Sequence, residues 1–320
     1  MSNTKDPRPL FLNKINLPSL RVVFSPERNV LLCGGRVEIK ERADDEDPKI
    51  YSLRAAIYKA YPNYDIFRPE EIQHWQRDGI YKNLVDFEKD LAGVFSLVVV
   101  ILESPGSLAE LGAFSQLPDL AQKLIVIKSK QFETPADKNS FINLGILRYI
   151  SEKNPSIVKV YPWELKLHQP PDIPEETVND VISDIQLSLD SLTKNPLFNH
   201  SDNSHVMILI RQLVTWFTAL KESEIYKYLE IFKVVIDKSE LRSKLFLLEE
   251  LDILSKDKYS DSTFYFSGEN KFHSIGVSLK DGETFDSLRL KMDCNSYYNE
   301  SAGESHRMRL MSRVVAGGVK

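Results

Sequence analysis

The feature that most constrains the fold is an unbroken apolar run at residues 97–102 that leads directly into a turn of small residues. The run is rich in valine and has no polar alternation, as expected of a strand buried on both faces of a parallel sheet. Glu103, Ser104 and Pro105 follow it, and a helical pattern with Glu110 in its first turn comes next. The sequence therefore predicts a parallel strand that places a carboxylate near its carboxyl end.

The rest of the N-terminal half repeats this alternation. Further strand candidates lie at residues 30–33, 64–67, 124–127 and 157–161, and helical patterns lie at 50–61, 80–93 and 107–122. Strands that alternate with helices predict a parallel sheet covered on both faces. We therefore expect a Rossmann/flavodoxin-like α/β domain at residues 29–168. In the flavodoxin-like order, the strands at 30–33 and 97–102 are neighbours at the point where the strand order reverses.

The remaining segments have other compositions. Residues 1–28 contain four prolines and predict an extended arm. Residues 169–200 predict a proline-containing linker and a helix that bridges the two halves. Residues 201–295 show three helical patterns and a hairpin pattern, the order of a winged helix-turn-helix domain. Residues 296–320 predict a flexible tail. The expected class is thus an α/β domain followed by a mostly helical winged-helix domain.

Composition excludes several classes of protein. Only Cys33 and Cys294 are present, so no disulfide framework is expected, and the histidines show no ligand spacing, so no metal site is expected. The longest apolar runs are far shorter than the roughly 20 residues that span a bilayer. A net charge of −5 argues against coating of nucleic acid by bulk electrostatics. We expect a cytoplasmic protein with no membrane contact.

Two loops of small residues are expected to meet where the strand order reverses. Cys33, Gly34 and Gly35 end one strand, and the segment from Glu103 to Ser107 ends the other. Glycines allow close approach of the backbone to a ligand, and a helix start at Ser107 would offer free N–H groups. The residues expected to line a ligand pocket in these loops are Cys33, Gly34, Gly35, Ser104, Gly106 and Ser107.

Glu110 has two interpretations. It could attack the sugar carbon of a nucleoside, or it could be the third helical residue of a Ser107-x-x-Glu110 capping box. The helix dipole favours an ionised Glu110 under both. Glu88 lies near the apolar face of its predicted helix, as either a functional carboxylate or a residue at the rim.

Further candidates follow other predicted strands. Asp65, Arg68 and Glu70 could reach ribose hydroxyls or phosphate, or could form a surface turn. Asn143 could contact a ligand or serve only as a turn residue. In the C-terminal half, Lys238, Arg242 and Lys244 near the start of the predicted recognition helix could contact nucleic-acid phosphates. That half is slightly acidic, so protein docking remains the alternative.

Four motifs in combination resemble the effector proteins of type II retrons, which are bacterial anti-phage systems. They are residues 31–35, 65–70, 103–115 and 140–143. The resemblance implies a nucleoside deoxyribosyltransferase-like domain, Glu110 as nucleophile, Glu88 as a second acidic residue, and Gly34 and Gly35 beside the ligand. It implies a toxin that cleaves the N-glycosidic bond of NAD, which is its substrate, with no cofactor.

The same resemblance implies partners. The retron reverse transcriptase and its multicopy single-stranded DNA (msDNA), or the precursor RNA, would hold the effector inactive in a homo-oligomer or filament. Ser104 departs from plain deoxyribosyltransferases, which usually carry Asp there, and Ser107 replaces a Thr. This puts transfer between nucleosides in doubt more than bond cleavage.

Two other functions stay open from the sequence. A nucleotide-sensing regulator that binds DNA or protein without catalysis would fit the capping interpretation of Glu110. A phosphoribohydrolase of the lysine-decarboxylase-like family would need an arginine to hold the 5′-phosphate, for which Arg36 and Arg68 are the candidates.

Overall fold

The computed structural model describes residues 5–25, 28–37, 50–60, 66–72, 79–120, 122–166 and 172–315. The chain is a mixed α/β protein that forms two compact units. We call Glu27–His74 with Asn83–Leu192 the α/β unit. We call Met1–Pro26, Trp75–Lys82 and Thr193–Lys320 together the helical unit.

A five-stranded sheet forms the centre of the α/β unit, and every pairing in it is parallel. Its strands, in spatial order, are β3 (Ile66–Phe67), β2 (Val30–Cys33), β4 (Leu97–Ile101), β5 (Leu124–Ser129) and β6 (Val158–Tyr161). The predicted neighbours β2 and β4 are confirmed, with Leu31 opposite Val98. β2, β4 and β5 are buried along their whole length, which explains their continuous apolar sequences.

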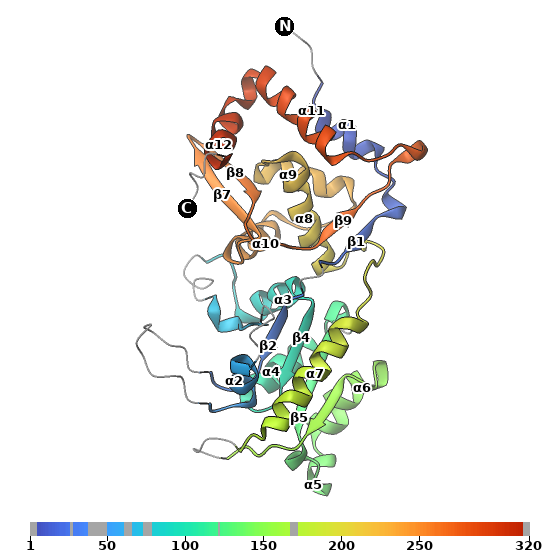
Figure 1. Ribbon diagram of the computed structural model, residues 1–320, viewed down its shortest axis with the longest axis vertical. Coiled ribbons are helices and arrows are strands. Elements are labelled where there is room, and N and C mark those ends of the chain that lie inside the picture. The colour runs from blue at the N-terminus through green and yellow to red at the C-terminus, as the bar shows by residue number, and fades with distance from the viewer. Residues whose placement is uncertain are drawn as a thin grey trace. The chain divides into compact units, whose positions relative to one another are not determined.

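Helices cover the sheet of the α/β unit. They are α2 (Leu53–Ala60), α3 (Leu84–Val94), α4 (Pro105–Phe114), α5 (Pro135–Lys138), α6 (Arg148–Lys153) and α7 (Glu175–Ser191). The helix predicted to bridge the two halves is α7, and it instead packs on the sheet, where Figure 1 shows it in front of the strands. Val178, Val181 and Ile185 recur at helical spacing and join the same core as the strands.

Three helices and a hairpin form the middle of the helical unit, in the predicted order. They are α8 (Asn203–Phe217), α9 (Glu222–Ile231), α10 (Lys238–Glu250) and the antiparallel strands β7 (Leu254–Tyr259) and β8 (Ser262–Ser267). α8 lies within the apolar core, since nearly all of its residues from Val206 to Phe217 are buried.

The described residues of both terminal segments form helices and a strand, which corrects the expectations of an extended arm and a flexible tail there. The N-terminal segment forms α1 (Pro7–Lys14) and β1 (Arg21–Val23), which pairs with β9 (Ser274–Gly276). The C-terminal segment forms α11 (Ser287–Glu300) and α12 (Ser305–Val315). Pro7 starts a helix because it occupies the first helical position, where a missing N–H costs nothing, and the Asp6 carboxylate caps that helix.

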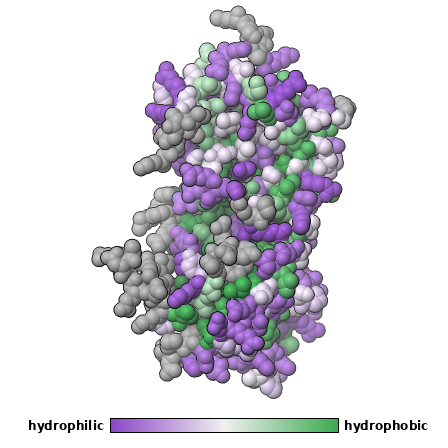
Figure 2. Space-filling model, viewed as in Figure 1, coloured by the Kyte–Doolittle hydropathy of each residue, from purple (hydrophilic) through white to green (hydrophobic). Residues whose placement is uncertain are grey.

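The surface mixes hydrophilic and hydrophobic residues on the face in view (Figure 2). Within the part of the chain that the structure describes, no helix combines the length and apolar character needed to cross a membrane.

Candidate active site

A cluster of ionisable side chains lies at the carboxyl ends of β2 and β4, where their electrostatic fields act on one another. We call it the carboxylate cluster, and its members are Cys33, Arg54, Glu70, Glu88 and Glu110. They come from the end of β2, from α2, from the turn after β3, from α3 and from α4. The parallel topology gathers them, because all strands of such a sheet end at one edge.

The local structure of α4 decides between the two interpretations of Glu110. The helix begins at Pro105, not at Ser107, and its N-cap is Ser104. The Ser107 backbone N–H donates to Ser104 Oγ at 3.1 Å, and the Ser104 N–H donates to Ser107 Oγ at 3.2 Å. The capping box is therefore Ser104 with Ser107, and the expected Ser107–Glu110 box is wrong. Glu110 lies in the second turn, so capping does not explain it.

Glu110 is half-buried, and its carboxylate has little hydrogen bonding. The Cys33 thiol donates to it, while its Oε2 atom has no hydrogen-bond partner among the residues that the structure describes. Burial raises the pKa of Glu110 to about 7, although the Arg54 guanidinium opposes the shift. An unsatisfied buried carboxylate oxygen is costly to keep unless it has a function.

Glu88 is the second buried carboxylate of the cluster, at 9% exposure on the apolar side of α3. Burial, together with the charges of Glu110 and Glu70, raises the pKa of Glu88 to about 7. Near neutral pH both carboxyl groups are therefore partly protonated. Two carboxyl groups in this state can act as one base and one acid.

Arg54 is the cation of the cluster, and sequence analysis missed it. Its Nη1 and Nη2 atoms donate to the two carboxylate oxygens of Glu70 at 2.8 and 2.5 Å, and its side chain is 2% exposed. Burial works against the charge, but the pairing with Glu70 prevails, and the pKa of Arg54 is raised. Glu70, a predicted ligand contact, is thus an ion-pair partner of Arg54. An arginine within an otherwise apolar helix pattern was the available signal.

Glu103 was also missed, and it organises the loops around the cluster. Its carboxylate accepts hydrogen bonds from the backbone N–H groups of Gly35, Leu53 and Arg54 at 2.8 to 3.0 Å. These bonds join the end of β4 to the turn after β2 and to the start of α2. Its position immediately after the buried strand was the signal that could have identified it.

The close approach of Glu103 also explains the two glycines. A Cβ atom on Gly35 would lie 2.9 Å from Glu103 Cγ, and one on Gly34 would lie 3.0 Å from Glu103 Oε1. The two glycines were predicted to line a ligand pocket. The close packing of Glu103 against them is itself sufficient to require glycine at both positions.

Replacing Glu103 with glutamine is expected to lower the free energy of unfolding of the α/β unit by about 2–3 kcal/mol. Glutamine has one acceptor oxygen, so at least one of the three N–H donors loses its partner. The side-chain NH2 group of glutamine would also face backbone N–H donors, which cannot accept its hydrogen bonds. Urea unfolding followed by Trp163 fluorescence in a Trp75→Phe, Trp216→Phe background measures the loss. Glu152→Gln, which removes one side of an exposed ion pair with Arg148, is the matched control and should change little. A loss no larger than that of the control would contradict the role given to Glu103.

The other predicted residues of the two loops shape the turn itself. Ser104 Oγ donates to the Gly34 carbonyl oxygen at 3.1 Å, which holds the two loops together. Ser107 is fully buried, and its hydroxyl donates to the Ser104 carbonyl oxygen at 2.9 Å. Gly106 is exposed in the first turn of α4. Ser107 therefore has no surface to offer a ligand.

Arg68 and Asn143 do not join the carboxylate cluster. The Arg68 Nε atom donates to Glu71 at 2.9 Å, and its guanidinium lies 4.0 Å from the centre of the Tyr58 ring. Asn143 accepts from Lys128 Nζ at 2.8 Å and donates to the Asp137 carbonyl oxygen, both near the end of β5. Asp65 lies outside the described residues.

The cations predicted to contact nucleic acid are in part engaged within the helical unit. Lys244 is 7% exposed, and its Nζ lies 2.5 Å from Asn203 Oδ1. Arg242 is exposed and forms an ion pair with Glu222 at 2.9 Å, whereas Lys238 lies exposed in the first turn of α10. A phosphate could reach Lys238 and Arg242, but not Lys244.

The donor chemistry of the cluster does not suggest a metal. Within the described ranges, no three histidine, cysteine or acidic side chains are arranged to hold a metal ion. The nearest cation to Glu110 and Glu70 is Arg54.

These features define a mixed α/β protein in which two carboxyl groups of raised pKa, Glu88 and Glu110, lie at the carboxyl ends of parallel strands. A sequence model of the family described as "STM3845 retron effector protein" matches residues 50–256. That match covers more than half of the chain, and the chain therefore belongs to this family of retron effectors.

Two curated relatives from Escherichia coli agree with that membership. "Retron Ec86 putative ribosyltransferase/DNA-binding protein" is 34% identical over 139 residues, which are 43% of this chain and 42% of the relative. "Retron Ec73 putative ribosyltransferase/DNA-binding protein" is 34% identical over 77 residues, which are 24% and 23% of the two chains. The matched stretches thus span less than half of either relative.

Proposed function

We propose that this protein is the toxic effector of a retron anti-phage system and that it cleaves the N-glycosidic bond of NAD or a related nucleotide. The observation that carries the proposal is the half-buried Glu110 carboxylate, whose buried Oε2 atom has no partner among the described residues and whose charge acts on Glu88. The ribosyltransferase names of the two relatives support the same bond type.

The cluster can perform this reaction by a two-step displacement. The Glu110 carboxylate attacks C1′ of the ribose, and the bond to the nicotinamide nitrogen breaks. The ring takes the bonding electrons and becomes neutral, so it leaves without a proton. Water then attacks C1′ and displaces Glu110, and Glu88 accepts the water proton. Arg54 holds a positive charge beside the site and favours the ionised form of Glu110.

The α/β unit and the helical unit each support a domain type that is consistent with this function. The strand order β3-β2-β4-β5-β6 supports a Rossmann/flavodoxin-like, deoxyribosyltransferase-like domain. The order of α8, α9, α10, β7 and β8 supports a winged-helix domain. Reverse transcriptase and msDNA would hold the effector inactive in a homo-oligomer or filament in the cytoplasm. The DNA-binding names of the relatives support a nucleic-acid partner.

The test is to incubate the purified full chain with NAD and, separately, with nicotinamide mononucleotide and purine nucleoside monophosphates, and to separate the products. Release of nicotinamide with loss of NAD supports the proposal. Release of a purine base alone identifies the phosphoribohydrolase alternative. No cleavage of any of these substrates, with NAD still bound by the protein, favours the regulator without catalysis.

The pH dependence of cleavage gives a second prediction. We expect the rate to rise with pH with a midpoint of about 7, because Glu110 must lose its proton before it can attack. Glu70→Gln should move that midpoint to lower pH, since the charge of Glu70 raises the pKa of Glu110 and Arg54 lowers it. The rate of the variant and wild type is measured between pH 5 and 9. A midpoint that shifts upward, or does not shift, would contradict this assignment.

A further inference from the structure

The chain leaves α8 of the helical unit through a strained turn at Thr218. The φ and ψ angles of Thr218 are 67° and −42°, and the Ala219 N–H donates across it to the Phe217 carbonyl oxygen at 2.7 Å. This is close to the geometry of the rare, strained kind of γ-turn. A β-branched residue at positive φ is an outlier, and its conformation is disfavoured by about 5- to 100-fold in an equilibrium constant.

Two side chains from the C-terminal helices hold this turn in place. The Tyr298 hydroxyl of α11 donates to the Phe217 carbonyl oxygen at 3.0 Å, and Arg307 Nη1 of α12 donates to the Ala219 carbonyl oxygen. Tyr298 and Arg307 are each 1% exposed. We call α11 and α12 together the latch. The closed latch and the strained turn are therefore joined by buried hydrogen bonds.

The chain after the turn is fixed as well, so Thr218 makes the reversal alone. The Leu220 N–H donates to the Tyr265 carbonyl oxygen of β8 at 3.1 Å, and the Tyr265 N–H donates to the Leu220 carbonyl oxygen at 2.8 Å. Phe217, Ala219 and Leu220 are completely buried. The strain at Thr218 can therefore be relieved only when the groups that hold Phe217 and Ala219 move away.

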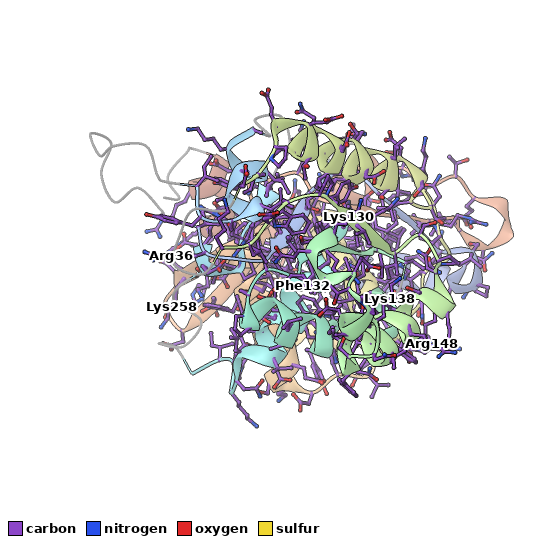
Figure 3. The ribbon with its side chains drawn as sticks, turned by 90° about the horizontal axis from the view of Figure 1, so that it is seen from below. Arg36, Lys130, Phe132, Lys138, Arg148 and Lys258 are labelled. Carbon is purple, nitrogen blue, oxygen red and sulfur yellow. The ribbon has the colours of Figure 1, made fainter. Side chains whose placement is uncertain are left out.

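The outer contacts of the latch do not involve the turn. α12 packs on β7, where Arg309 Nη1 donates to the Tyr259 hydroxyl. Lys258, next to Tyr259 on β7, is exposed and is labelled in Figure 3. The polar contacts that join the latch to the turn are thus those of Tyr298 and Arg307.

We propose that the latch is releasable and that the strained turn at Thr218 lowers the free energy needed to release it. In the closed state, the hydrogen bonds of Tyr298 and Arg307 offset the strain. When α11 and α12 detach, the carbonyl groups of Phe217 and Ala219 lose these donors and Thr218 relaxes to negative φ. The helical unit then has a closed and an open state, whose populations a binding partner can shift. This goes beyond the proposed cleavage reaction and needs no turnover to be tested.

Cys294 reports on release of the latch. Leu290, Cys294 and Tyr298 recur at helical spacing on the buried face of α11, and Cys294 is 0% exposed. A thiol reagent can therefore reach Cys294 only when α11 detaches or the unit unfolds. Cys33 is the other cysteine of the chain and lies in β2, so it reports on the α/β unit.

Release is measured by treating the full-length protein with excess thiol reagent under native conditions and following each cysteine peptide by mass spectrometry. Thr218→Gly removes the strain from the closed state, because glycine tolerates positive φ, and should slow Cys294 labelling about 5-fold. Lys233→Gly is the matched control, since Lys233 also has positive φ, at 61°, but is exposed beyond the end of α9. It should leave the Cys294 rate within about 2-fold, and neither variant should change Cys33 labelling.

Two results of this measurement would overturn the proposal. One is Cys294 labelling in Thr218→Gly that is as fast as in the wild type or faster. The other is equal slowing by Thr218→Gly and Lys233→Gly, because Cys294 would then be reached only by unfolding of the whole helical unit.

Tyr298→Phe tests whether the turn and the latch open together. It removes one hydrogen bond of the latch, keeps the ring, and should speed Cys294 labelling about 10-fold. Hydrogen exchange of the peptide that contains Ala219 and Leu220 should become faster by a similar factor. Faster labelling of Cys294 with unchanged exchange at these two amides would mean that α11 detaches without the turn, and the proposal would be wrong. Unchanged labelling in Tyr298→Phe would contradict it equally.

Discussion

Glu110→Gln is expected to lower the rate of NAD cleavage by about 10³-fold or more. Glutamine keeps the shape of the side chain but cannot attack C1′ or stabilise positive charge there. The measurement is nicotinamide release by the purified full chain at pH 8, where wild-type Glu110 is mostly ionised. Glu88→Gln should lower the rate of NAD cleavage by a smaller factor, because solvent can replace a proton acceptor but not a positioned nucleophile.

Glu110→Gln should leave the fold intact and increase its stability. The pKa of Glu110 is raised to about 7 in the folded chain, so the folded state binds more protons than the unfolded state between pH 4.5 and 7. Stability from this group is therefore lost as the pH rises through that range. Removing the charge should raise the free energy of unfolding at pH 8 by at most about 3 kcal/mol.

A control separates catalysis from general damage. Glu152→Gln lies in the same unit at an exposed ion pair and should change neither the rate nor the stability. Wild-type activity in Glu110→Gln would remove Glu110 from the mechanism, whatever the substrate. Loss of activity together with loss of stability would assign Glu110 to the fold instead.

The sheet could be predicted from sequence because its information is local. The continuous apolar run of β4 predicts a buried strand in any parallel sheet. The placement of β2 beside β4 follows from the usual strand order. Glu110 and Glu88 were found because a carboxylate at a strand end or on an apolar face conflicts with burial. Both signals lie within a few residues of the side chain concerned.

The errors share a different physical origin. Whether Ser104 or Ser107 is the N-cap of α4 depends on Ser104 being held by the Gly34 carbonyl oxygen of another loop. Arg54 and Glu103 are explained by contacts with Glu70 and Gly35, which the chain brings together only after the sheet forms. The terminal segments were expected to be loose because their partners are distant in the sequence: Arg8 and Glu224 are 216 residues apart, and Arg307 and Glu224 are 83 residues apart.

The pairing of Glu224 with distant arginines gives the second large effect. Glu224→Gln is expected to lower the free energy of unfolding of the helical unit by about 3 kcal/mol. Arg8 of α1 and Arg307 of α12 both donate to Glu224 Oε1, at 2.7 and 2.6 Å. These arginines are 4% and 1% exposed, so removing the charge leaves two buried cations with Glu304 as their remaining shared partner. Urea unfolding followed by Trp216 fluorescence in a Trp163→Phe background measures the change.

Glu222→Gln is the matched control, because Glu222 lies on the same helix and pairs with an arginine that is 63% exposed. Its loss should be below about 1 kcal/mol. The two arginines hold the pKa of Glu224 below its usual value, so its stabilisation is complete above the ordinary carboxyl pKa and is lost as the pH falls through the lowered one. The difference in free energy of unfolding between Glu224→Gln and wild type should therefore become smaller at acidic pH. A gap that stays constant to pH 2 would mean that the ion pairs contribute no net free energy and that packing of the arginine stems holds both ends of the chain.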